Sequence, residues 1–198
     1  MLLDLVGIGD SITYGFPYGP GASWLNLAAG ASGLKAENKG INGETTGEMA
    51  SRFYQDVVCL KPRVVIILGG TNDAWIGTTP AKAEGNVSSM ADQALRAEIL
   101  PVIALPPPLC RRGSDISASF LARMAEALQS YRQAYRGLAF SRGLKILDFY
   151  HSLLDPDTGW GRRDYFVDDA HPNRNGYRAM AELAVTFFKE LEPKPQQL

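Results

Sequence analysis

Short aliphatic runs recur along the chain and alternate with longer segments whose apolar residues follow a helical spacing. The clearest run, Val64–Leu68, is apolar at every position, which is typical of a strand covered on both faces. Leu34–Ile41 is weaker and more polar, which favours an edge strand. The remaining predicted strands are Leu3–Ile8, Ile99–Leu105 and Leu144–Phe149.

Four longer segments predict helices because their apolar residues recur every three or four positions. They are Thr46–Leu60, Pro80–Ala97, Ile116–Leu138 and Asn173–Leu191. We interpret the apolar stripes as faces that pack on a core. Strands that alternate with helices predict a single α/β domain over residues 1–198, with helices on both faces of a parallel sheet. The tail after about residue 192 contains two prolines and is expected to fray.

Glycine-containing segments follow three of the predicted strands, at the edge where parallel sheets bind ligands. Gly9–Thr13 presents Ser11 at the end of a strand and the start of a helix, a position that suits a nucleophile. Gly40–Thr46 and Gly69–Asp73 offer backbone N–H groups and the Asn72 amide as donors. Taken separately, each segment also fits an ordinary turn or a helix cap.

A fourth polar segment, Asp168–Asn173, lies in the loop before the last predicted helix. Asp168 precedes His171 by three positions, so its carboxylate can fold back in one turn and bond the imidazole. A plain N-cap with an incidental histidine is the alternative. Because a parallel sheet brings its strand ends to one rim, the four segments together predict a nucleophile, a base, an orienting carboxylate and oxyanion donors at one place.

Composition narrows the classes of function. The net charge is −1, whereas a nucleic-acid or anionic-membrane binder would need a basic excess, so no nucleic-acid partner is expected. Two cysteines are too few for a disulfide framework, and imidazole chemistry has only His151 and His171 available. The chain lacks a signal-peptide pattern and an apolar run of about 20 residues. We expect no stable membrane insertion and a cytoplasmic location, with a secreted form trimmed of its signal as the alternative.

The four segments, in this order, resemble the sequence blocks of the SGNH hydrolases, also called the GDSL esterase/lipase family. The blocks stand here as Gly9-Asp10-Ser11-Ile12-Thr13, Gly43, Gly70-Thr71-Asn72-Asp73 and Asp168 to Asn173. The resemblance extends from residue 5 to about 180. It implies a three-layer α/β/α fold whose five-stranded parallel sheet has the order 2-1-3-4-5.

The resemblance also implies a role for each residue and a serine esterase that works through an acyl-enzyme. Ser11 would be the nucleophile and His171 the general base that later acts as an acid, with Asp168 orienting the imidazole. The backbone N–H groups of Ser11 and Gly43 and the side-chain amide of Asn72 would hold the oxyanion. This chemistry requires neither a metal nor an organic cofactor.

The substrate pocket is expected to be formed by loops after the strands. Its predicted wall residues are Tyr14, Phe16, Trp75, Ile76, Pro107, Leu109 and Phe166. Short loops favour an open site for a small-molecule ester with a short acyl group; lysophospholipid or acyl-thioester hydrolysis at the same site is the alternative. Asp10 and Asp73 are expected to bond loop backbone, and the oligomeric state is left open.

Other classes of function fit the sequence less well. A dinucleotide-binding fingerprint would need a third glycine where Ile12 stands, and the α/β-hydrolase fold needs Gly-x-Ser-x-Gly. Two histidines are too few for a usual His-rich zinc site. His151 also follows an aspartate, Asp148, by three positions, but we prefer His171 as the base because Pro-Asn and a helix follow it. A non-catalytic binding module on the same scaffold stays an alternative.

Overall fold

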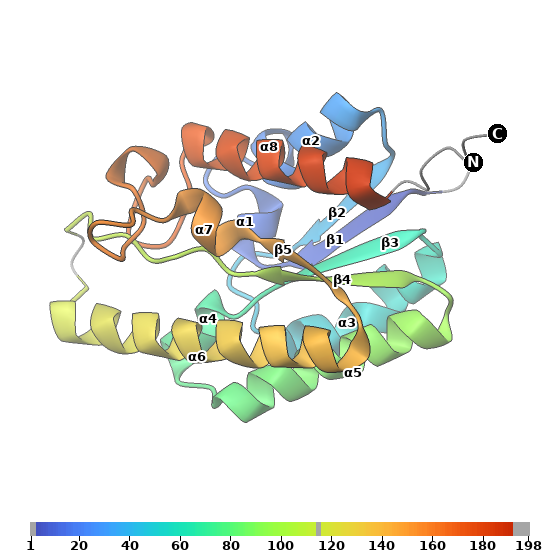
Figure 1. Cartoon of the computed structure of the whole chain (residues 1–198), viewed down its shortest axis with the longest axis horizontal. Helices are drawn as coiled ribbons and strands as arrows, with labels where there is room; N and C mark the ends of the chain where they lie inside the picture. The colour runs from blue at the N-terminus through green and yellow to red at the C-terminus, as the bar shows by residue number, and fades with distance from the viewer. Residues whose placement is uncertain (1–2, 114–115, 192–198) are drawn as a thin grey trace.

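Five parallel strands form one sheet in the order β2-β1-β3-β4-β5 (Figure 1). The computed structural model describes residues 3–113 and 116–191 of the chain. The strands are β1 (Leu5–Gly9), β2 (Ala36–Gly40), β3 (Val64–Leu68), β4 (Leu100–Leu105) and β5 (Lys145–Asp148). This order is the one that the family resemblance implies, and each strand lies within or next to a run predicted from the sequence.

Helices cover both faces of the sheet and complete three layers (Figure 1). One layer holds α2 (Trp24–Ser32) and α8 (Arg174–Leu191), and the other holds α3 (Thr46–Asp56), α5 (Pro80–Arg96) and α6 (Ala118–Arg142). Successive residues of β3 contribute to opposite cores: Val65 and Ile67 pack toward α3, α5 and α6, whereas Ile66 and Leu68 pack toward α2 and α8. The uninterrupted apolar run of β3 therefore follows from its position between two helical layers.

Helix α2 has no counterpart among the predicted helices. Ser23 caps its start by accepting a hydrogen bond from Asn26 N at 3.3 Å, and Gly33 ends it in a left-handed conformation with φ of 67°. Trp24 and Leu25 are buried in the core shared with α8, but the next turn buries only alanines. Small residues give little hydrophobic periodicity, which is why the pattern did not reveal this helix.

The observed helix ends also depart from the predicted ones. α3 stops at Asp56 and a 3₁₀ turn covers Val58–Leu60, while α6 continues to Arg142, where Gly143 in the left-handed region stops it. The predicted fraying after residue 192 lies outside the described residues. Within residues 3–113 and 116–191, no helix has both the length and the apolarity needed to cross a membrane.

Three short helices begin immediately beyond strand ends. They are α1 (Ser11–Tyr14) after β1, α4 (Thr71–Ile76) after β3 and α7 (Phe149–Leu153) after β5. The strands are parallel, so the N-termini of these helices gather at the carboxyl edge of the sheet. The glycine-containing segments predicted to carry the chemistry therefore lie at this edge.

Candidate active site

Ser11 is the first residue of α1, directly beyond the end of β1. Asp10 caps this helix, since its carboxylate accepts a hydrogen bond from Ile12 N at 2.8 Å. Gly9 has no room for a side chain: a Cβ there would clash with Thr13 Oγ1 and with the backbone of β3. The glycine permits a tight passage from strand to helix, and this passage places Ser11 at the sheet edge.

His171 meets Ser11 from the opposite end of the chain. Its Nε2 lies 3.0 Å from Ser11 Oγ, and its Nδ1 lies 2.8 Å from Asp168 Oδ2. The other carboxylate oxygen of Asp168 accepts hydrogen bonds from the backbone N–H groups of Ala170 at 2.8 Å and of His171 at 2.7 Å. The loop thus folds back in one turn, as the Asp-x-x-His spacing predicts, and its own backbone holds the carboxylate in place.

The charge state of Asp168 determines how the imidazole is oriented. Burial raises the pKa of Asp168, but hydrogen bonds from the His171 side chain and from two backbone N–H groups outweigh it, so the pKa lies below its ordinary value. An ionised carboxylate accepts the Nδ1–H of His171. The Nε2 lone pair then points at Ser11 Oγ, which is the arrangement that activates a serine hydroxyl.

Asn72, a predicted oxyanion donor, is hydrogen-bonded to the loop that contains Gly43, another predicted donor. Its side-chain Nδ2 donates a hydrogen bond to the Glu44 carbonyl oxygen at 2.9 Å, and a primary amide has a second N–H group left for a ligand. Gly43, which directly precedes Glu44, has φ of 85°, a left-handed conformation that favours glycine. Asn72 and Ser11 line the same cavity. The Asn72 amide therefore ties the Gly43–Glu44 loop to the edge where Ser11 lies.

Asp10 and Asp73 both bond the polypeptide, as predicted. The buried Asp73 carboxylate accepts hydrogen bonds from Thr46 N at 2.8 Å and from Thr46 Oγ1 at 2.7 Å, which fixes the first residue of α3. Asp10 is 1% exposed, and this burial raises its pKa to about 6. Both aspartates thus form hydrogen bonds with the polypeptide that carries the site.

Sequence reasoning missed Arg52, which holds the same loops together from α3. Its Nε donates to Glu44 Oε2 at 2.7 Å, and its Nη2 donates to the carbonyl oxygens of Gly9 at 3.2 Å and Lys39 at 2.9 Å. The pair with Asp56 at i+4 is visible in the sequence. The contacts with Gly9 and Lys39 depend on β1 lying beside β2, so the sequence pattern did not reveal them.

Comparison with protein families decides the assignment. The model of the GDSL-like lipase/acylhydrolase family matches residues 8–179. The chain belongs to this family. It is a hydrolase that acts on esters.

Individual proteins resemble this chain in sequence or in fold. The uncharacterized lipoprotein YqeF of Bacillus subtilis (strain 168) is 39% identical over 180 residues, covering 79% of this chain and 74% of that protein. Esterase TesA of Pseudomonas aeruginosa is 32% identical over 112 residues, covering 52% of this chain and 55% of TesA. A member of the lipolytic protein G-D-S-L family from Veillonella parvula DSM 2008 has the same fold, with a TM-score of 0.81, 21% identity, and coverage of 94% of this chain and 98% of that one.

A cavity of about 280 Å³ opens beside Ser11 in this GDSL hydrolase. Trp75, Ile116 and Met124 contribute apolar groups to its lining, and Asn72 and His171 contribute polar groups. Of the predicted wall residues, Trp75 lines this cavity. Met124 lies on α6 and Ile116 two residues before its start; neither was predicted, because no local pattern shows that this part of the chain packs beside Ser11.

The other predicted wall residues have different surroundings. Phe16 packs on the His171 ring with 4.6 Å between centroids, and Ile76 is 67% exposed. Tyr14 is half-buried, and Pro107 is buried with its carbonyl oxygen facing Arg132. Leu109 and Phe166 are 3% and 1% exposed, one in each core. The structure thus brings Trp75 and Phe16 to the site and places Leu109 and Phe166 inside the protein.

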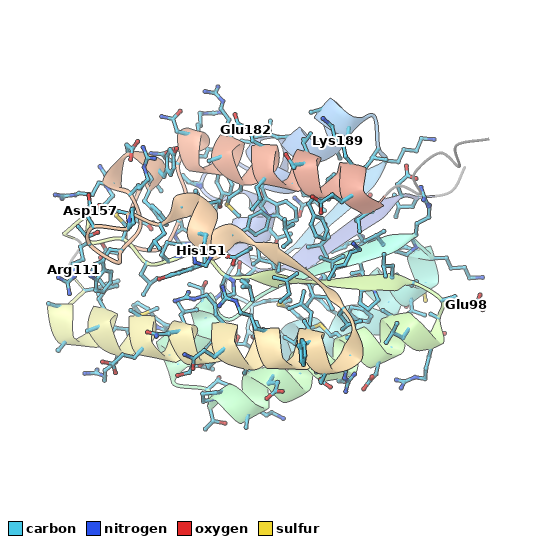
Figure 2. The ribbon with its side chains drawn as sticks, in the orientation of Figure 1. Glu98, Arg111, His151, Asp157, Glu182 and Lys189 are labelled. Atoms are coloured by element: carbon cyan, nitrogen blue, oxygen red, sulfur yellow. The ribbon has the colours of Figure 1, made fainter. Side chains whose placement is uncertain are left out.

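His151, labelled in Figure 2, lies on α7 and forms a second pair of the same kind. Its Nδ1 lies 2.7 Å from Asp148 Oδ2, and Arg136 contacts the same carboxylate oxygen at 2.8 Å. His151 does not line the cavity beside Ser11. Among the described residues, no group of three or more His, Cys, Asp or Glu is placed to hold a metal ion.

Proposed function

We propose that this hydrolase cleaves carboxylic esters of short acyl groups through an acyl-enzyme formed on Ser11. The observation that carries the proposal is the chain of hydrogen bonds from Ser11 Oγ to His171 Nε2 at 3.0 Å and from His171 Nδ1 to Asp168 at 2.8 Å. Serine, imidazole and carboxylate in this sequence of contacts are the arrangement that lets a hydroxyl attack a carbonyl carbon.

In the acylation step, Ser11 Oγ bonds to the ester carbonyl carbon while His171 Nε2 takes the hydroxyl proton. The carbonyl oxygen becomes an oxyanion, for which the N–H groups of Ser11 and Gly43 and the second amide N–H of Asn72 serve as donors. Collapse of the tetrahedral intermediate breaks the bond to the leaving oxygen, which receives the proton from His171. The ionised Asp168 stabilises the imidazolium in both steps.

Deacylation repeats the same chemistry with water. His171 Nε2 takes a proton from water, whose oxygen attacks the acyl carbon, and the proton then returns to Ser11 Oγ as the carboxylic acid leaves. No further reactant is required, and the histidine acts alternately as base and acid.

The size and lining of the cavity support a short acyl group. Its volume of about 280 Å³ lies just below the usual range for small-molecule sites, about 300–1,000 Å³. Trp75, Ile116 and Met124 offer it a largely apolar surface. Esterase TesA and an arylesterase of Vibrio mimicus, which is 28% identical over 134 residues, carry names that agree with an ester substrate.

The decisive experiment uses the two Asp-x-x-His pairs of the chain as a matched comparison. We expect Ser11→Ala to lower kcat by about three to six orders of magnitude and His171→Ala to lower it by a similar factor. His151→Ala should stay within a few-fold of the unmodified enzyme. A Ser11→Ala enzyme that keeps a tenth of the rate, or a folded His151→Ala enzyme that loses turnover, would contradict the assignment.

A panel of p-nitrophenyl esters tests the substrate class. We expect kcat/KM to be highest for acetate to butyrate and to fall for octanoate and longer chains, because the cavity is small. A serine-directed phosphonate should label Ser11, as judged by peptide mass spectrometry. A rate that rises steadily with chain length, or a higher kcat/KM for acyl-CoA than for any oxygen ester, would contradict the short-acyl ester assignment.

A further inference from the structure

Arg132, in the middle of α6, is a buried cation without a carboxylate partner among the described residues. The residue is 6% exposed. Its Nη1 donates to the carbonyl oxygens of Pro106 and Pro107, each at 3.3 Å. A guanidinium has five N–H groups; those on Nε and Nη2 form no hydrogen bond within the described part of the chain, and these two nitrogens are not fully buried, so they can reach a ligand. A buried charge in a protein is normally paired, so this one is an exception.

Arg132 keeps its charge at neutral pH. The pKa of its guanidinium is lowered to about 10, chiefly by burial and also by the neighbouring Arg136, while Tyr150 and Asp148 act in the opposite direction. Asp148 is itself bound to Arg136 and to His151. Arg132 therefore carries a positive charge that no protein carboxylate contacts in the described structure.

A cavity of about 230 Å³ opens at this guanidinium, between α6 and the segment from Tyr150 to Trp160. The Arg132 guanidinium lies over the Tyr150 ring at 4.0 Å, and Arg111 lies over the Trp160 ring at 4.1 Å. The wall mixes polar groups with apolar surface from Leu109. The exposed Glu126 also lines the cavity, but it makes no ion pair with Arg132. No residue lines both this cavity and the one beside Ser11.

We propose that the cavity at Arg132 binds a small organic anion, whose carboxylate or phosphate group pairs with the guanidinium and whose apolar part lies against Trp160 and Leu109. The planar fork of a guanidinium matches two oxygens of either group, and the neutralised charge supplies the driving force. The proposal is independent of the acyl-enzyme mechanism, because the two sites are lined by different residues.

Isothermal titration calorimetry at constant ionic strength tests the proposal with four probes: acetate, benzoate, inorganic phosphate and phenyl phosphate. Saturable 1:1 binding is expected, with the aromatic probe of each pair stronger than the small one. The ratio of benzoate to phenyl phosphate affinity distinguishes a carboxylate site from a phosphate site. Wild-type protein that shows no saturable binding of any probe up to 50 mM would overturn the proposal.

Matched variants locate the bound anion. Arg132→Gln should weaken binding at least tenfold, whereas Arg136→Gln, which removes the same charge one helical turn later, should change it less than threefold. His171→Ala should also change it less than threefold. Equal losses in both arginine variants would reveal a general charge effect, and loss in His171→Ala would place the anion beside Ser11; either result overturns the proposal.

If Arg132→Gln does not fold, Gln129→Glu tests whether Arg132 binds the anion. Gln129 is exposed and lines the same cavity, three positions before Arg132 on α6. A glutamate there supplies an intramolecular counter-ion. We expect anion affinity to fall at least tenfold and Tm without anion to rise. Unchanged affinity together with unchanged Tm would contradict the unpaired state of Arg132.

Discussion

Replacing Arg52 with glutamine should weaken both the fold and the turnover of this hydrolase. Arg52 Nη2 lies 2.5 Å from Glu44 Oε2, and the same nitrogen donates to backbone carbonyls at the ends of β1 and β2. Its Nη1 pairs with Asp56 at 2.7 Å. Glutamine is neutral and too short to make these contacts together. Glu44 would then remain as a mostly buried carboxylate without a cation among the described residues.

The size of the effect follows from the burial of the pair. Removing one partner of a fully buried ion pair costs about 3–5 kcal/mol of unfolding free energy. The side chains of Arg52 and Glu44 each keep 15% exposure, so water screens part of the interaction. The i,i+4 pair with Asp56 adds only about 0.3–0.5 kcal/mol. We expect the free energy of unfolding to fall by about 2–4 kcal/mol.

Turnover should fall because the Glu44 carbonyl oxygen accepts the Asn72 amide. We propose Asn72 as an oxyanion donor, and loss of one such donor costs about 10²–10³ in kcat. Partial displacement of Asn72 together with Glu44 should therefore cost about tenfold or more. Because Arg52 does not line the cavity at Trp75 and Met124, its replacement should change KM much less than kcat.

Urea unfolding and steady-state kinetics with p-nitrophenyl acetate measure the two effects. Arg63→Gln is the matched control: its guanidinium is 56% exposed and lies 3.4 Å from Asp4, so its loss should cost less than about 1 kcal/mol and leave kcat unchanged. An Arg52→Gln protein as stable as the Arg63→Gln protein would refute the buried-pair reasoning. A change in KM with normal kcat would refute the proposed effect on the Gly43–Glu44 loop.

Three further predictions use the same measurements. Asn72→Ala should lower kcat by about 10²–10³ with little change in KM, and a rise in KM alone would make Asn72 a substrate-binding residue. The pKa of Asp10 is raised to about 6 in the folded protein, so its contribution to stability is present below about pH 4 and is lost as pH rises through 6. Asp10→Asn should remove this loss, which shifts the difference in unfolding free energy between pH 4 and pH 7 by about 3 kcal/mol relative to wild type; parallel pH profiles would contradict it. Burial raises the pKa of the Cys110 thiol, whereas Cys59 is exposed, so Ellman's reagent should modify Cys59 first in the native protein, and equal rates would contradict the described burial.

The features predictable from the sequence are those encoded within a few neighbouring residues. The apolar run of β3, the glycine before Ser11 and the turn of Asp168 onto His171 each depend on local pattern and local chemistry, and each stands in the structure as the pattern indicates. α2 was not predicted, because alanines contribute little to a hydrophobic periodicity. The place of Met124 in the cavity wall could not be predicted, because it depends on how α6 packs against the rest of the fold, which no local sequence pattern specifies.

The two Asp-x-x-His pairs show why local pattern alone does not determine the base. In both pairs the aspartate accepts from the histidine ring, at 2.8 Å for His171 and 2.7 Å for His151, and from the histidine backbone N–H, at 2.7 Å and 3.1 Å. What differs is the far nitrogen: His171 Nε2 faces Ser11 Oγ, 160 residues away in sequence, whereas the His151 side chain is 63% exposed. An oriented imidazole becomes a candidate base only where the fold brings a hydroxyl to it. Ser11, which follows β1, places a hydroxyl beside His171. Within the described chain, no hydroxyl group forms a hydrogen bond with the ring of His151, which follows β5.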